Sequence, residues 1–150
     1  MPKISFHLGL GKWEPFQGVL PTEGLRRGDP LSPLLFNIAA EGLSGLMSKA
    51  IDGGLYRAFL VGSKKVEVSL LQYADDTIFL KEATMENVRA IKAILHAFEM
   101  ASGLKINFAK SSCGAFGVPH RWIYGASSYL NCRVMSFPVT YLGIPIGANP

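Results

Sequence analysis

Apolar residues recur at two different spacings along the chain, and each spacing predicts a different kind of element. Helical spacing predicts one helix that begins after Ser32 and ends at Asp52, and another that begins after Thr84 and stops at Gly103. Ser32 and Thr84 are expected to cap these helices, with Pro33 at the first position of the first helix, where its missing N–H does no harm. The predicted buried positions are Leu34, Leu35, Ile38, Ala39, Leu43, Leu46, Met47 and Ala50 in the first helix, and Val88, Ile91, Leu95 and Phe98 in the second.

Shorter apolar runs bounded by turn residues predict strands. Residues 9–31 are rich in glycine and proline and predict loops, with one strand around residues 13–16. A strand pair over residues 139–146 is expected to turn near Gly143, and a short helix is expected over residues 121–130. The other predicted strands are residues 4–8, 56–61, 66–73, 77–80 and 105–108.

The composition narrows the class of protein without identifying it. The chain has 150 residues, of which 49% are hydrophobic and 17% charged, so it suits one folded domain rather than a disordered segment. Its net charge of +4 permits a polyanionic partner without requiring one. Cys113 and Cys132 have no Cys or His neighbour at metal-ligand spacing, which favours reduced thiols over a disulfide or a zinc site. The sequence contains neither a membrane-spanning run nor a signal peptide, so we expect an intracellular protein.

Two adjacent carboxylates, Asp75 and Asp76, interrupt the apolar run from Ser69 to Leu80. A carboxylate is costly to desolvate without a partner, and neighbouring side chains of a regular strand point to opposite faces. The pair therefore predicts a β-hairpin tip, where both carboxylates stay half exposed and can meet a divalent metal. Magnesium favours a few carboxylates together with substrate phosphates and water, and such ions serve phosphoryl transfer. For the dipeptide taken by itself, an ordinary surface turn is the alternative, because turns favour Asp.

Four segments, read in order, give the Asp pair a more specific context. They are Gly24 to Asn37, the Tyr-Ala-Asp-Asp of residues 73–76, the Gly-Leu-Lys-Ile-Asn of residues 103–107 with Lys110-Ser111, and the Tyr-Leu-Gly-Ile-Pro-Ile-Gly of residues 141–147. In this order and spacing they resemble the reverse transcriptases of LINE-type non-LTR retrotransposons, especially those of plants. The resemblance runs from about residue 3 to residue 147.

This resemblance implies an α+β fold in which helices pack on one face of an antiparallel palm sheet. Residues 1–112 or so would form the palm with its catalytic hairpin, and residues 113–150 would form the end of the palm toward the thumb. The implied reaction is RNA-directed DNA synthesis, in which the primer 3′ hydroxyl attacks the α-phosphate of a dNTP and pyrophosphate leaves. The implied partners are an RNA template, a DNA primer and a dNTP. Mg²⁺, or Mn²⁺ in its place, is the implied cofactor, with no small-molecule cofactor and no membrane.

The same resemblance assigns roles to individual residues. Asp75 would be a catalytic metal ligand, and Asp76 would be its carboxylate neighbour at the same site. Tyr73 and Ala74 would lie close to the primer end and the minor groove of the template–primer duplex. The implied nucleotide- and template-binding loop consists of Arg26, Arg27, Gly28, Asp29 and Pro30, the primer-grip region of Tyr141, Leu142 and Gly143, and Lys110 is the implied proton donor.

Some of these roles have alternatives in the sequence itself. Arg27 occupies a position that is most often Gln in these elements, and arginine cannot accept a hydrogen bond, which argues against a nucleotide-pocket role for its side chain. Asp29 and Ser32 also suit turn formation and helix capping. Lys110 also suits a solvated lysine beside a loop.

One carboxylate of the family's site is missing. Asp29 is the first aspartate of the chain, so the upstream motif that carries the third metal ligand is absent, as are the fingers. We therefore expect the isolated chain to be inactive as a polymerase, and we expect an unpaired sheet edge beside the hairpin. Two other interpretations stay open: a non-catalytic remnant of a decayed retrotransposon that binds nucleic acid weakly at most, and a group II intron maturase. An active element would work in the nucleus, with the cytoplasm as the alternative.

Overall fold

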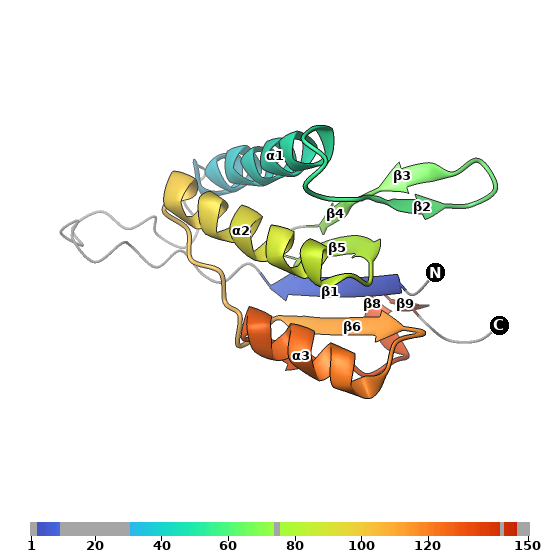
Figure 1. Cartoon of the computed structure of the whole chain (residues 1–150). Helices are drawn as coiled ribbons and strands as arrows, with labels where there is room; N and C mark the ends of the chain where they lie inside the picture. The colour runs from blue at the N-terminus through green and yellow to red at the C-terminus, as the bar shows by residue number, and fades with distance from the viewer. Residues whose placement is uncertain (1–2, 10–30, 74–75, 142, 147–150) are drawn as a thin grey trace.

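The computed structural model describes residues 3–9, 31–73, 76–141 and 143–146 (Figure 1). Within these ranges the helices are α1 (Leu31–Asp52), α2 (Met85–Ser102) and α3 (His120–Leu130). The strands are β1 (Lys3–Gly9), β2 (Phe59–Val61), β3 (Val66–Val68), β4 (Leu70–Tyr73), β5 (Asp76–Glu82), β6 (Ser112–Phe116), β7 (Arg133–Val134), β8 (Val139–Tyr141) and β9 (Ile144–Ile146). The fold is α+β, as the sequence predicts.

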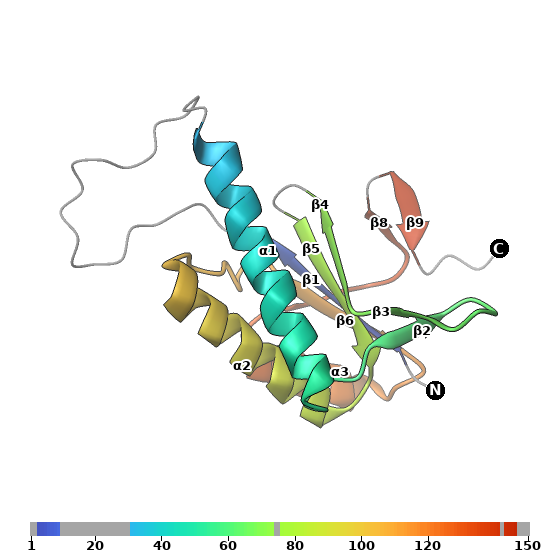
Figure 2. The ribbon, with the colours of Figure 1, turned by 90° about the horizontal axis from the view of Figure 1, so that it is seen from above.

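The main sheet has the strand order β4-β5-β1-β6-β7. Its first four strands are antiparallel to their neighbours, and β7 joins β6 in parallel. The strand pairs β2–β3 and β8–β9 form separate two-stranded sheets. Figures 1 and 2 place α2 and α3 on one face of the main sheet and the β8–β9 pair on the other. The helices therefore leave the second face of the sheet for other contacts.

The hydrophobic core lies between the sheet and the helices. Phe79 is fully buried on β5 and joins a cluster to which α1 contributes Leu43 and Met47. The predicted stripe of α2 is confirmed, because Val88, Ile91, Leu95 and Phe98 are all buried in this cluster. Because alternate residues of a strand share a face, Thr77 and Lys81 lie on the same face of β5 as Phe79, and both are buried.

The predicted ends of α2 are confirmed in atomic detail. Thr84 has the extended conformation of an N-cap, and its Oγ1 accepts a hydrogen bond of 3.2 Å from the N–H of Asn87. Gly103 ends the helix with a φ of 71°, a conformation that glycine adopts without strain. The predicted short helix and the final strand pair are confirmed as α3 and β8–β9, with Gly143 at a φ of 79° in the turn.

The strand predicted at residues 105–108 is wrong. Residues 103–111 form an irregular segment, and the strand that follows is β6. Local bonds replace the sheet ladder here: the carboxylate of Glu99 accepts from the N–H of Ile106, and Asn107 accepts from the N–H of Lys110. Leu104 and Ile106 are buried, so the alternation that predicted a strand instead marks two anchors of a loop.

Three boundaries on the first half of the chain also differ from the prediction. The first helix begins at Leu31, so Ser32 lies inside its first turn rather than at the N-cap; Pro33 is still harmless there, because the first four N–H groups of a helix lack internal partners. The strand expected from residue 56 begins only at Phe59. The strand expected over residues 66–73 divides at Ser69 into β3 and β4, which belong to different sheets.

Two residues predicted to be buried on α1 are exposed. Leu34 retains 56% and Ile38 59% of its accessible surface. Figure 2 shows why, since the first turns of α1 project beyond α2 and the sheet. Helical periodicity identifies an apolar face, but it does not say how much of the helix has a neighbour.

Within the described part of the chain the hairpin does have an unpaired edge, which is β4, the outermost strand of the main sheet, and not β5. Strand β1 lies between β5 and β6 and pairs with both, so β5 has a partner on each side. The alternation of Ile4, Phe6 and Leu8 with polar residues suits such a strand. The strand predicted around residues 13–16 lies outside the described residues. No helix in the described part of the chain is long and apolar enough to cross a membrane.

Candidate active site at the β4–β5 hairpin

The predicted acidic hairpin is built by β4 and β5. Their register pairs Leu70 with Phe79 and, at the far end, Tyr73 with Asp76. Tyr73 is 62% exposed and Asp76 is half buried, as the sequence predicts for a hairpin tip. Ala74 and Asp75, which connect the two strands, lie outside the described residues. The hairpin therefore presents a phenol and a carboxylate side by side where it leaves the sheet.

A partly buried hydrogen bond connects this hairpin to α1. The hydroxyl of Ser44 donates to Oε1 of Gln72 over 3.0 Å. Gln72 pairs across the hairpin with Thr77, whose side chain is fully buried. Within the described residues, Nε2 of Gln72 and Oγ1 of Thr77 have no hydrogen-bond partner. Sequence analysis missed this pair, although a Gln inside an apolar run is a signal that could have been used.

The register between β1 and β5 determines which residue lies beside Asp76 at the end of the sheet. The β1–β5 register places Gly9 directly opposite Asp76 and His7 opposite Ile78. Gly9 has no side chain, so β1 adds no carboxylate beside Asp76. The described residues contain no cluster of three or more His, Cys, Asp or Glu side chains that could hold a metal ion. Of the two carboxylates that the sequence predicts at this tip, the described residues include Asp76 alone.

Lys110 lies at the same end of the sheet as Asp76. Ser112, the first residue of β6, pairs with His7 of β1. Lys110 lies two residues before Ser112, in the turn that leads into β6, and therefore close to the end of the sheet where β1 ends and β5 begins. Its side chain is exposed, and its backbone N–H donates to Asn107 in a turn. The structure thus brings Lys110 to the hairpin end of the sheet, and its role there stays a prediction.

The other predicted site residues are only partly described. Tyr141 ends β8, and Gly143 forms the turn to β9 on the sheet face opposite α2 and α3 (Figure 2). Leu142 between them lies outside the described residues, and so does the predicted nucleotide- and template-binding loop of Arg26, Arg27, Gly28, Asp29 and Pro30. Cys113 and Cys132 are free thiols, as predicted.

Together the fold and the site define an α+β protein with an acidic hairpin at one end of an antiparallel sheet. The family model for reverse transcriptase (RNA-dependent DNA polymerase) matches residues 3–146. Since this match covers nearly the whole chain, the protein belongs to the reverse transcriptase family.

Two curated proteins are similar to parts of this chain. An uncharacterized mitochondrial protein of Arabidopsis thaliana is 44% identical over 59 residues, which is 39% of this chain and 48% of that protein. The retrovirus-related Pol polyprotein from the type-1 retrotransposable element R2 of Nasonia vitripennis is 32% identical over 96 residues, which is 64% of this chain and 8% of that protein. The matched segments thus cover less than half of the first relative and a small part of the second. The predicted resemblance to reverse transcriptases is confirmed by the family match.

Proposed function

We propose that this chain supplies the hairpin-bearing part of the palm of an RNA-directed DNA polymerase. In that reaction the primer 3′ hydroxyl attacks the α-phosphate of a dNTP opposite an RNA template, and pyrophosphate leaves. The observation that carries the proposal is the hairpin end at Tyr73 and Asp76, in a chain of the reverse transcriptase family. Residues 1–112 or so would be palm, and the remainder would lead toward the thumb.

In this proposal Asp75 and Asp76 hold a divalent metal, Mg²⁺ or Mn²⁺. The metal, when bound, neutralises charge on the reacting phosphate and lowers the pKa of the attacking hydroxyl. The exposed phenol of Tyr73 contacts the primer end, together with Ala74. Residues 26–30 contact the nucleotide and template, residues 141–143 hold the primer, and Lys110 is the proton donor toward the leaving pyrophosphate.

We further propose that the isolated chain does not polymerise DNA. A two-metal centre needs several carboxylates, and the strand beside Asp76 offers Gly9 at the matching position. The same observation favours the second candidate function, a non-catalytic remnant that retains the hairpin and weak nucleic-acid affinity. The two candidates share the fold and differ in whether another segment or chain completes the site.

Primer extension on an RNA template, with Mg²⁺ and then Mn²⁺, tests the inactivity directly. The purified chain should add no nucleotides above the level of its Asp76→Asn variant. Extension that is robust in the unmodified chain and lost in Asp76→Asn would overturn the inactivity and would support the catalytic assignment of the hairpin.

Metal binding tests the geometry independently of activity. Directly opposite residues of an antiparallel pair have Cβ atoms about 4.5–5.5 Å apart, so Gly9→Asp places a second described carboxylate beside Asp76. We expect this variant to bind Mn²⁺ about tenfold more tightly than the unmodified chain, since affinity follows the number of charged ligands. Gly125→Asp, at an exposed position of α3 with open space around its Cβ, is the matched control. Equal Mn²⁺ affinity in the two variants would contradict the assignment of the metal to this hairpin.

A further inference from the structure

A groove lies between α2 and α3, on the helix-covered side of the sheet. Its volume is about 400 Å³, which is within the range of small-ligand sites. The lining residues are Arg89, Lys92, Ala93, His96 and Glu99 of α2, Phe108 of the segment after α2, and Tyr129 of α3. Figures 1 and 2 place these helices away from the face that carries β8–β9. None of the residues that line the groove is among those proposed for the active site.

Two cationic residues of the groove, Arg89 and Lys92, share one side of α2 with His96. Arg89, Lys92 and His96 recur at intervals of three and four residues, which places them on one helical face. The buried stripe of the core lies on the neighbouring side of α2. Arg89 and His96 are exposed at the rim, and no ion pair of Arg89 is found among the described residues. The rim can thus bring positive charge to an anionic ligand.

Lys92 contacts Tyr129, one of the two aromatic residues that line the groove. Its Nζ donates to the backbone carbonyl of Tyr129 over 2.5 Å and lies 4.4 Å from the centre of the Tyr129 ring. These two contacts hold α2 against the end of α3 and set the position of the ring. Tyr129 remains 41% exposed, so its ring still offers surface to a ligand.

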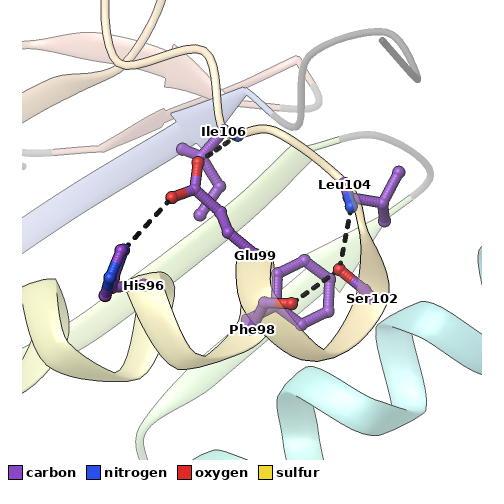
Figure 3. A network of polar contacts seen from close by, with 6 residues as sticks. All are labelled: His96, Phe98, Glu99, Ser102, Leu104 and Ile106. Carbon is purple, nitrogen blue, oxygen red and sulfur yellow. Dashed lines mark hydrogen bonds and ion pairs between the residues drawn. The ribbon is translucent and has the colours of Figure 1, made fainter. Parts of the chain in front are cut away.

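Glu99 is the one acidic residue that lines the groove, and both of its carboxylate oxygens contact other residues of the protein. Figure 3 shows that carboxylate between the loop and His96. One oxygen accepts from the N–H of Ile106 over 2.8 Å, and the other lies 3.8 Å from Nδ1 of His96. Glu99 therefore anchors the loop that leads to Phe108 in the groove.

The lining combines aromatic and aliphatic surface with a cationic rim. Phe108, Tyr129 and Ala93 supply the apolar surface, on which a planar ring can stack. Arg89 supplies a fork of donors that matches a phosphate. A nucleotide unit has both parts, a flat base and an anionic phosphate, and its size suits the groove.

We propose that this groove binds single-stranded nucleic acid, with one base stacked on Tyr129 and Phe108 and a neighbouring phosphate held by Arg89. This site goes beyond the proposed function, because it lies apart from the hairpin where primer and template would meet. It would hold a strand that has left, or has not yet reached, the active site. Charge complementarity supports this occupant, as the chain carries a net charge of +4.

Fluorescence anisotropy with a fluorescein-labelled single-stranded RNA 12-mer tests the proposal on the full chain. Stacking on an aromatic side chain is worth about 1–3 kcal/mol per base, or roughly a 5- to 150-fold change in affinity. We therefore expect Tyr129→Ala to weaken binding about fivefold or more, and Arg89→Glu to weaken it about tenfold. Lys64→Glu makes the same charge change in the exposed turn between β2 and β3, and we expect it to change affinity less than about twofold.

Crosslinking locates the strand and separates this proposal from the proposed function. Ultraviolet crosslinking of the same RNA, followed by mass spectrometry, should yield adducts at Tyr129 or Phe108 in the unmodified chain and in Asp76→Asn alike. Adducts confined to the β4–β5 hairpin would overturn the groove as a nucleic-acid site and leave the proposed function intact. The groove would also be overturned as the binding site if Arg89→Glu and Lys64→Glu weakened RNA binding equally. The same holds if polyglutamate displaced the labelled RNA as well as unlabelled RNA does. Thermal melts of each variant confirm that the protein tested is folded. If Arg89→Glu is not folded, Arg89→Gln provides a milder change at the same position.

Discussion

Replacing Lys81 by methionine, which removes its ionisable amine, should raise the free energy of unfolding of this protein at neutral pH. Lys81 is fully buried on the helix-facing side of β5. Its Nζ has no hydrogen-bond partner among the described residues. Burial lowers the pKa of Lys81 from 10.5 to about 7, while the thiols of Cys113 and Cys132 act in the opposite direction. A buried amine without a partner should cost stability.

The sign and size of the effect follow from proton linkage. Between pH 7 and pH 10.5 the unfolded chain holds a proton on Lys81 that the folded chain has released, so the free energy of unfolding rises with pH across this window. One pKa unit corresponds to about 1.4 kcal/mol. The shift therefore costs about 5 kcal/mol below about pH 6 and about 4 kcal/mol at pH 7, and this cost vanishes above about pH 11. Methionine has similar length and no charge, so Lys81→Met should recover most of it.

Urea unfolding of the two proteins at several pH values from 6 to 11 measures this gap. Lys81→Met should be more stable by several kcal/mol at pH 6 to 7, and the gap should shrink as the pH rises toward 10.5. Lys105→Met, at an exposed position, is the control and should show no such trend. A gap that does not change with pH, or a methionine variant that is less stable at pH 7, would refute the reasoning.

Three further substitutions test contacts that shape the fold, each by urea unfolding against the unmodified chain. Thr84→Ala removes the cap of α2 and should cost about 1 kcal/mol; an unchanged midpoint would show that the cap is unimportant. Glu99→Leu leaves the N–H of Ile106 without its acceptor and should cost about 1–3 kcal/mol, whereas Glu99→Gln keeps an acceptor and should cost less; equal losses would argue against this bond. Gly114→Ala would place a Cβ 2.6 Å from the ring of Phe137 and should cost about 1–3 kcal/mol; a neutral result would mean that the ring moves freely.

The sequence predicted the elements whose signals are local. The helix over residues 85–102 was predicted with its cap, its buried stripe and its glycine stop, because each depends on residues a few positions apart. The strand predicted at residues 105–108 is wrong, although Leu104 and Ile106 are buried alternately as in a strand. The N–H of Ile106 donates to the carboxylate of Glu99, seven residues earlier, and not to a neighbouring strand. Local pattern does not reveal such competition.

The candidate site was predicted in part for the same reason. The motif predicted a hairpin with Tyr73 and Asp76 at its end, and the strand register places both there. The partners across the sheet were beyond prediction, since nothing near Gly9 in the sequence indicates that it lies opposite Asp76. The buried Lys81 and the buried Nε2 atom of Gln72 were missed because their burial depends on the neighbours of β4 and β5, and those come from other parts of the chain.

The central position of β1 has a consequence for how the chain folds. Lys3–Gly9 is the first of the described segments to leave the ribosome, yet its partners are β5 at Asp76–Glu82 and β6 at Ser112–Phe116. Strand β1 therefore has no backbone hydrogen-bond partners until β5 and β6 have been synthesised. Contacts between distant segments close slowly because long loops must be ordered first. During synthesis the β4–β5 hairpin and the apolar residues of β1 should thus be open to chaperones, or to the strands of a neighbouring nascent chain.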